Sequence, residues 1–226
     1  MIKAIITDIE GTTSSLSFVK EVLFPYARAN ISDYVRVHRG EPQLDLLFKA
    51  ICDEVGEELG IESIIAQLIQ WIDEDKKVTS LKSLQGLIWE AGYKKGDFKG
   101  HVYLDAVENL KAWKAKGLDL YIYSSGSVYA QKLLFEHTEY GDLTPLFSGY
   151  FDTNIGGKKE SSSYEKIAAQ LAIPSKELLF LSDIKEELVA AKVAGFQTIW
   201  LTRDDVSDLQ AEPLQVSSFD FIDLKI

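Results

Sequence analysis

Cysteine is almost absent from the sequence, since Cys52 is the single one among 226 residues. No disulfide can therefore form within the chain, which fits a reducing compartment. Cys52 lies in an apolar stretch, residues 46–52. This pattern predicts a small buried side chain on a helix rather than a reactive thiol.

Long apolar runs are missing as well. No stretch approaches the roughly 20 apolar residues that span a bilayer. The apolar run before Asp8 is too short for a signal peptide. We therefore expect a cytoplasmic protein with no membrane partner.

Basic residues are scarce relative to acidic ones, with 24 Lys and Arg against 35 Asp and Glu and a net charge of −11. Nucleic acids and anionic membrane surfaces are bound through clusters of Lys and Arg, so this balance argues against both. A phosphorylated small molecule is compatible with it if a metal ion and a few local cations reverse the field at the site. Because heptads and obvious apolar patches are also lacking, we expect a monomer.

Short apolar runs are present, and they are continuous rather than alternating. Such runs predict buried strands of a parallel sheet, here at residues 4–6, 120–123, 149–151, 178–181 and 198–201. Helical patterns at residues 106–116, 164–171 and 186–194 accompany them, and residues 219–222 are predicted as a final edge strand. The alternation of strand and helix predicts an α/β fold with a doubly wound, mainly parallel, Rossmann-like sheet.

Residues between about 15 and 100 follow a different pattern. Apolar residues recur at helical spacing from Ile61 to Ile72 and form one stripe, and residues 18–29, 44–52 and 81–89 also favour helices. No repeat or linker rich in Pro, Gly or Ser separates this block from its surroundings. We therefore predict a catalytic core domain at 1–14 and 101–226, with a helical cap domain at 15–100 inserted after the first strand.

Polar side chains follow the predicted strands. Ligands of open α/β sheets bind beyond the carboxyl ends of the strands, so we expect these side chains to converge at one edge. In chain order they are Asp8 and Glu10 after the first strand, Ser124 and Ser125 after the second, Lys158 after the third, and Asp183, which follows Ser182, after the fourth.

This set of residues has the parts that phosphoryl transfer needs, namely a nucleophile, neutralisation of the phosphate oxygens and a proton donor. Asp8 is the candidate nucleophile. Mg²⁺ suits Asp8, Asp183 and a backbone carbonyl, because it prefers a few carboxylates together with water and phosphate oxygens. Gly11 permits a turn that leaves Glu10 free to act as general acid and then base. Lys158 supplies the cation.

The segment from Asp8 to Thr12 resembles the first motif of the haloacid-dehalogenase superfamily, and Ser124, Lys158 and the pair Ser182-Asp183 match its other three motifs. More narrowly, residues 8–13, 18–20 with 23–26, 121–128 with 130–135, and parts of 151–161 are similar to the enolase-phosphatase family of methionine salvage. This resemblance covers the chain from end to end.

The resemblance implies a Mg²⁺-dependent enzyme, with one ion per chain, that acts twice on 2,3-diketo-5-methylthiopentyl-1-phosphate. It first enolises this phosphorylated diketone and then removes the phosphate to give an acireductone. Asp8, Glu10 and Asp183 match the metal-site positions of the family. Ser124, Ser125 and Lys158 match its substrate-binding positions, and Asp8, Glu10 and Lys158 are the predicted catalytic residues.

Several roles stay open at this point. Superfamily phosphatases usually have Asp where this chain has Glu10, so Glu10 ligates the metal either by its side chain or by its backbone carbonyl. Lys159 competes with Lys158 for the role of the cation. Glu187, four residues after Asp183, either contacts metal-bound water or merely stabilises its helix. The group that abstracts the alpha proton is not identified.

Two other functions compete with this prediction. A simple phosphatase of the same superfamily would act on another small phosphate ester. A non-enzymatic phospho-receiver also places an aspartate, a hydroxyl and a lysine around Mg²⁺ on a doubly wound sheet, but receivers lack a large helical insert after the first strand.

Overall fold

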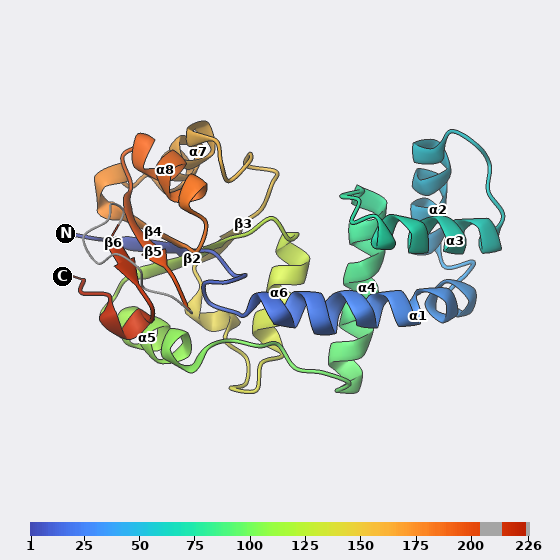
Figure 1. The fold of residues 1–226 in the computed structure, drawn as a ribbon, viewed down its shortest axis with the longest axis horizontal. Coiled ribbons are helices and arrows are strands. Elements are labelled where there is room, and N and C mark those ends of the chain that lie inside the picture. Colours follow the sequence, from blue (N-terminus) through green and yellow to red (C-terminus); the bar gives the residue numbers. More distant parts are fainter. Residues whose placement is uncertain (204–213, 225–226) are drawn as a thin grey trace. The chain divides into compact units, whose positions relative to one another are not determined.

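Continuous apolar runs form the strands of a parallel sheet, as the sequence predicts. The computed structural model describes residues 1–203 and 214–224 (Figure 1). Within these residues the strands are β1 (Ala4–Thr7), β2 (Asp119–Tyr123), β3 (Gly149–Phe151), β4 (Leu178–Ser182), β5 (Gln197–Leu201) and β6 (Leu214–Val216). They lie in the order β3-β2-β1-β4-β5-β6, and every pairing is parallel. The predicted α/β fold is therefore confirmed.

The register of the central strands aligns their carboxyl ends. Thr7 of β1 lies beside Ile122 of β2 and Leu181 of β4. The residues that follow these strands therefore emerge together at one edge of the sheet. The strand order reverses direction between β1 and β4, and this switch point is where open α/β sheets bind ligands.

Helices cover both faces of the sheet. Helices α7 (Ser161–Leu171) and α8 (Lys185–Val193) lie on one face, and α5 (Leu104–Ala115) and α6 (Val128–Glu136) lie on the other (Figure 1). The short helices η2 (Thr144–Leu146) and η3 (Ser175–Glu177) complete the connections. Helices α5, α7 and α8 agree with the sequence prediction within a few residues, whereas the sequence patterns above do not predict α6.

The predicted edge strand at residues 219–222 is wrong, because Phe219–Phe221 forms a 3-10 turn, η4. The Ser218 hydroxyl accepts a hydrogen bond from the Asp220 amide, and the Phe219 amide donates to Asp105 Oδ2 at 2.7 Å. The Phe219 ring stacks on Trp113 of α5 with the ring centroids 5.5 Å apart. Among the described residues, the sheet ends instead at β6.

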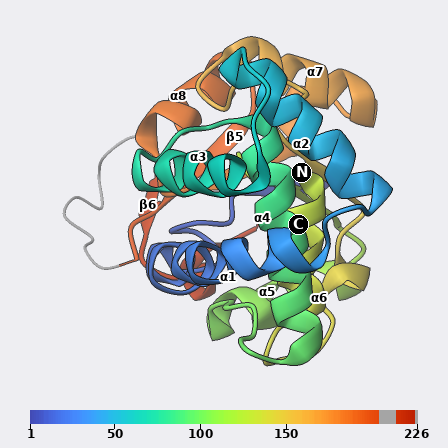
Figure 2. The same cartoon turned by 90° about the vertical axis from the view of Figure 1, so that its right-hand side faces the viewer.

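The chain divides into two compact units. The core unit comprises Met1–Leu16 and Gly100–Ile226, and the helical unit comprises Ser17–Lys99. The helical unit consists of a π-helical segment η1 (Phe18–Leu23) and helices α1 (Phe24–Val37), α2 (Pro42–Val55), α3 (Ile61–Asp73) and α4 (Thr79–Lys95) (Figure 2). All four segments predicted as helical are confirmed.

The helical unit has its own apolar core. Helix α1 packs against α3 and α4, and α2 packs against α4. The apolar stripe of α3 buries Ile64, Ile65 and Leu68, and Cys52 of α2 is buried as a free thiol, as predicted. Pro25, near the start of α1, lacks an amide hydrogen, and the turn that precedes α1 is π-helical rather than α-helical. In the part of the chain that the structure describes, no helix has the length and apolar character needed to cross a membrane.

Candidate active site

A hollow of about 120 Å³ lies at the carboxyl ends of the central strands in the core unit. All residues predicted to act in catalysis, substrate binding or metal binding line it. The lining residues are Asp8, Glu10, Leu16, Ser124, Ser125, Lys158, Asp183, Ile184 and Glu187. The structure thus brings together side chains from the ends of β1, β2 and β4, from the loop after β3 and from helix α8.

Asp8 directly follows β1 and is buried. Its amide continues the sheet by donating to Leu181 O at 2.9 Å, and the Ile9 amide donates to its carboxylate oxygen Oδ1 at 2.7 Å. The Thr13 hydroxyl donates to Asp8 O at 3.1 Å. The backbone and the carboxylate of Asp8 are therefore both fixed before any ligand binds.

Lys158 joins two carboxylates. Its Nζ lies 2.7 Å from Asp8 Oδ1 and 2.7 Å from Glu187 Oε2, and all three side chains are buried. Burial by itself lowers the pKa of Lys158, but the Asp8 and Glu187 carboxylates outweigh it and raise the pKa above its ordinary value. Lys158 is therefore a cation at neutral pH. Lys159 is exposed, and of the two lysines it is Lys158 that lines the hollow.

Glu187 is the residue whose surroundings the sequence did not predict. It lies in the first turn of α8, where its Oε2 accepts a hydrogen bond from the Ser182 hydroxyl at 2.8 Å as well as contacting Lys158. Burial and the charge of Asp8 raise the pKa of Glu187, while Lys158 opposes that shift. Its spacing from Asp183 placed it near the site, but the structure pairs it with Lys158.

Asp183 directly follows β4. Within residues 1–203 and 214–224, its buried Oδ1 has no hydrogen-bond partner. Burial and, secondly, the charge of Asp8 raise the pKa of Asp183 to about 7. Two carboxylates that repel each other in a small hollow are a suitable place for a cation.

The Oδ1 of Asp183, unpartnered among the residues that the structure covers, and the repulsion of Asp183 from Asp8 make these residues suitable for binding Mg²⁺. No cluster of three or more His, Cys, Asp and Glu side chains arranged for a metal occurs in the described residues. Mg²⁺ does not need one, because it is usually held by one or two carboxylates while the remaining ligands are water and substrate oxygens. Asp8 and Asp183 are two carboxylates of the hollow that could hold such an ion.

A tight turn follows Asp8 beside the hollow. The amides of Thr12, Thr13 and Ser14 all donate to Ile9 O, and Gly11 has a left-handed φ of +73°. A Cβ atom on Gly11 would overlap the Asp183 carboxylate. The absence of a side chain at this position therefore lets the turn and Asp183 approach closely. Glu10, at the start of the turn, is exposed and lines the hollow.

The loop after β2 faces the hollow with hydroxyl groups. Ser124 is buried, its amide donates to Phe151 O at 3.2 Å, and its hydroxyl accepts from the Gly126 amide at 3.2 Å. Ser125 is exposed beside it. Helix α6 begins immediately afterwards, capped by the Ser127 hydroxyl. A polar loop that leads into a helix N-terminus favours an anionic group such as phosphate.

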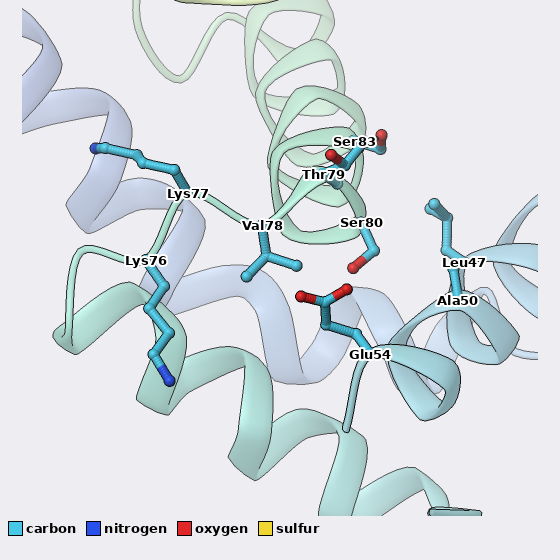
Figure 3. Close-up of a pocket in the computed structure, with 9 residues that line it drawn as sticks. All are labelled: Leu47, Ala50, Glu54, Lys76, Lys77, Val78, Thr79, Ser80 and Ser83. Atoms are coloured by element: carbon cyan, nitrogen blue, oxygen red, sulfur yellow. Dashed lines mark hydrogen bonds between the residues drawn. The ribbon is translucent and has the colours of Figure 1, made fainter. Parts of the chain in front are cut away.

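A larger hollow of about 380 Å³ lies inside the helical unit, among α2, α4 and the connection from α3 (Figure 3). Its two lysines, Lys76 and Lys77, are exposed and pair with Glu74 and Asp75 at 3.1 and 2.6 Å. Glu54 is the acidic residue of its lining, and no buried lysine joins two carboxylates there. The groups suited to catalysis therefore gather in the smaller hollow.

Known proteins are similar to this chain over nearly its whole length. The family model described as haloacid dehalogenase-like hydrolase matches residues 2–195. A protein of Methylococcus capsulatus named enolase-phosphatase E1 is 56% identical over 223 residues, covering 98% of each chain. A protein of the same name from Pseudomonas aeruginosa is 54% identical over 222 residues, again covering 98% of each. The crystal structure of the UTR4 protein from Saccharomyces cerevisiae has a TM-score of 0.84 and 33% identity, covering 98% of this chain and 100% of that one.

Proposed function

This chain belongs to the haloacid dehalogenase-like hydrolases and, within them, to the enolase-phosphatases, and from that membership we propose its reaction. It enolises 2,3-diketo-5-methylthiopentyl-1-phosphate and removes the phosphate to give the acireductone of methionine salvage, with Mg²⁺ as cofactor. The observation that carries the proposal is the placement of Asp8 at the switch point of the sheet, held by Lys158 at 2.7 Å and facing the same hollow as Asp183.

Asp8 is the nucleophile of the phosphatase step. One carboxylate oxygen attacks phosphorus and forms an aspartyl phosphate as the ester oxygen leaves. Lys158 and the Ser124 loop stabilise the negative charge on the phosphate oxygens. The side chains of Lys158 and Asp8 are both buried and already in contact. The charge of Lys158 therefore needs little reorganisation during the reaction.

Asp8, Asp183 and the backbone carbonyl of Glu10 would hold Mg²⁺, which would neutralise charge on the phosphate. The side chain of Glu10 is then free to move protons. Its exposed position at the rim of the hollow suits a general acid that protonates the leaving oxygen and then activates water to hydrolyse the aspartyl phosphate.

One assay distinguishes this proposal from its alternatives. Phosphate release and the absorbance of the enediol product are followed in the same reaction with the diketone phosphate. We expect both signals to rise together. Phosphate without enediol absorbance, or turnover of other phosphate esters alone, would indicate a simple phosphatase. A long-lived aspartyl phosphate without turnover would indicate a phospho-receiver.

Asp183→Asn is expected to raise the Mg²⁺ concentration needed for half-maximal activity by about tenfold or more, equivalent to at least about 1.4 kcal/mol of binding free energy. The amide keeps the shape of the side chain but removes one of the two carboxylates. The Mg²⁺ titration is compared with that of Glu186→Gln, an exposed neighbour outside the hollow. An unchanged Mg²⁺ requirement would show that Asp183 is not a ligand.

A second prediction for Asp183→Asn concerns its thermal midpoint, compared with that of the wild type in the absence of metal. The folded pKa of Asp183 lies above its ordinary value, so the ionised carboxylate reduces stability as pH rises from about 4 through about 7. At pH 8 without Mg²⁺, the variant should therefore be no less stable than the wild type.

We further propose that the helical unit acts as a cap that shelters the enol intermediate from stray protonation. The chain passes between the two units at residues 16–17 and 99–100. Hydrogen exchange at residues 14–17 and 96–101 is expected to slow when Mg²⁺ and a substrate analogue bind, with little change in β1 and β4. Protection confined to the strand ends would contradict a cap that closes about these segments.

A further inference from the structure

Lys158 belongs to a loop, residues 152–160, that connects β3 to α7 without regular secondary structure. Within the loop, turns are closed by backbone bonds from Ile155 to Asp152, from Gly156 to Thr153 and from Glu160 to Gly157. These local bonds do not tie the loop to the sheet. Its lysine nevertheless lies 2.7 Å from each of two buried carboxylates.

Two tyrosine hydroxyls connect this loop to the core. Tyr164 Oη of α7 donates to the carbonyl oxygen of Lys158 itself at 2.6 Å. Tyr123 Oη of β2 donates to Gly156 O at 2.9 Å. Both tyrosines have no solvent exposure. A buried hydroxyl without a partner is costly, so these bonds favour one position of the loop over others.

The two rings are themselves held rigidly. Tyr123 and Tyr164 meet edge to face with their centroids 5.6 Å apart, and Tyr164 also packs against Phe180 at 5.1 Å and Phe196 at 5.6 Å. The hydroxyls therefore project from fixed positions in the core.

At Gly156 the loop packs closely against helix α7, which restricts its movement. Its φ of +139° is unusual for residues with a side chain, and a Cβ atom there would overlap the Ser163 hydroxyl of α7. The loop thus lies directly against the first turn of α7. Its path is fixed both by this contact and by the two tyrosine hydroxyls. Such a supporting shell is expected where one side chain has to be aimed accurately.

We infer that Tyr164 and Tyr123 are positioning residues that hold Lys158 in line with Asp8 and with the phosphate of the substrate. Neither tyrosine lines the hollow, and each hydroxyl donates to a loop carbonyl instead. The inference rests on the proposed function, since it takes Lys158 to neutralise the transferred phosphate. The ring of Tyr123 is part of the buried core at β2, and its hydroxyl adds this second role.

Tyr164→Phe tests the inference by removing one oxygen atom. We expect kcat to fall about tenfold, because a reacting group misplaced by about 1 Å can cost up to about 10²-fold in rate. The matched control is Tyr150→Phe on β3, since no described residue is a hydrogen-bond partner of the buried Tyr150 hydroxyl. We expect kcat of this control to stay within about twofold of the wild type.

A double-mutant cycle separates positioning from a general loss of structure. We expect Tyr164→Phe to have less than about a twofold effect on kcat in a Lys158→Gln background, because two residues that act through one group are not additive. Rates are measured in single turnovers so that the slow variants can be compared. Equal losses in both backgrounds, or a loss no larger than that of Tyr150→Phe, would overturn the inference. If Tyr164→Phe fails to fold, Tyr123→Phe is placed in the same cycle with the same two criteria.

The assay also keeps this inference separate from the proposed function. Every variant is tested with the diketone phosphate and with p-nitrophenyl phosphate. A wild type that hydrolyses only p-nitrophenyl phosphate would refute the enolase-phosphatase proposal, whereas the cycle would still decide the role of Tyr164.

Discussion

Asp8→Asn is expected to lower turnover of the diketone phosphate by about 10⁴-fold or more, which corresponds to at least about 5.4 kcal/mol of activation free energy. The amide retains an oxygen that can accept the hydrogen bond of the Ile9 amide, so the turn after β1 should persist. It cannot attack phosphorus, and it no longer provides a negative charge for a metal ion or for Lys158. Lys158 would keep Glu187 as its partner.

The measurement combines phosphate release with the thermal midpoint. Asp33→Asn serves as the control, because Asp33 is an exposed carboxylate of α1 whose removal should leave both quantities nearly unchanged. Activity of Asp8→Asn within about tenfold of the wild type, a barrier difference of about 1.4 kcal/mol, would exclude Asp8 as the nucleophile.

Gly11→Ala is expected to reduce turnover by about 10²-fold. An alanine at a φ of +73° is strained, and its Cβ would also overlap the Asp183 carboxylate. Either the turn that carries Glu10 or the side chain of Asp183 must then move. A shift of about 1 Å in a reacting group is enough for a loss of this size. Excess Mg²⁺ should restore little activity, since the carboxylates themselves are displaced.

Gly117→Ala separates the two causes of that loss. Gly117 has a φ of +84°, similar to that of Gly11, but no atom lies within 4 Å of the position of its Cβ. The backbone strain, about 1–2 kcal/mol, should lower the thermal midpoints of both variants, and the overlap with Asp183 should add to the loss in Gly11→Ala. Only Gly11→Ala should lose activity strongly. Equal activity losses would mean that the close approach to Asp183 has no functional importance.

The sequence predicts much of this arrangement because the information is local. Strands β1 and β4 are buried on both faces, so their apolar runs are continuous and easily recognised. The residues after them, Asp8 and Asp183, then follow from the rule that ligands bind at strand ends. Their meeting in one hollow agrees with that reasoning, while their chemical roles stay predictions.

The remaining features depend on contacts between distant segments. The pairing of Lys158 with Glu187 is set by how α8 lies against the loop after β3, which no local pattern records. The alternation of Phe219 and Phe221 resembles a strand, but Asp105 accepts the Phe219 amide hydrogen and favours a turn. Gly11 indicates a turn in the sequence, although only the fold reveals that Asp183 occupies the space of its missing side chain.

The position of β1 in the middle of the sheet has a consequence for folding kinetics. Ala4 pairs with Asp119 on one side and with Leu178 on the other. More than 100 residues must therefore be synthesised after β1 before either of its partner strands is available. Sheets built from such distant pairings fold slowly, whereas helical segments with near-neighbour contacts order quickly. On the ribosome, we therefore expect the helical unit to gain structure before the sheet closes. Asp8 and Asp183 then meet only after β4 has emerged, so phosphatase activity should appear late and together with closure of the core.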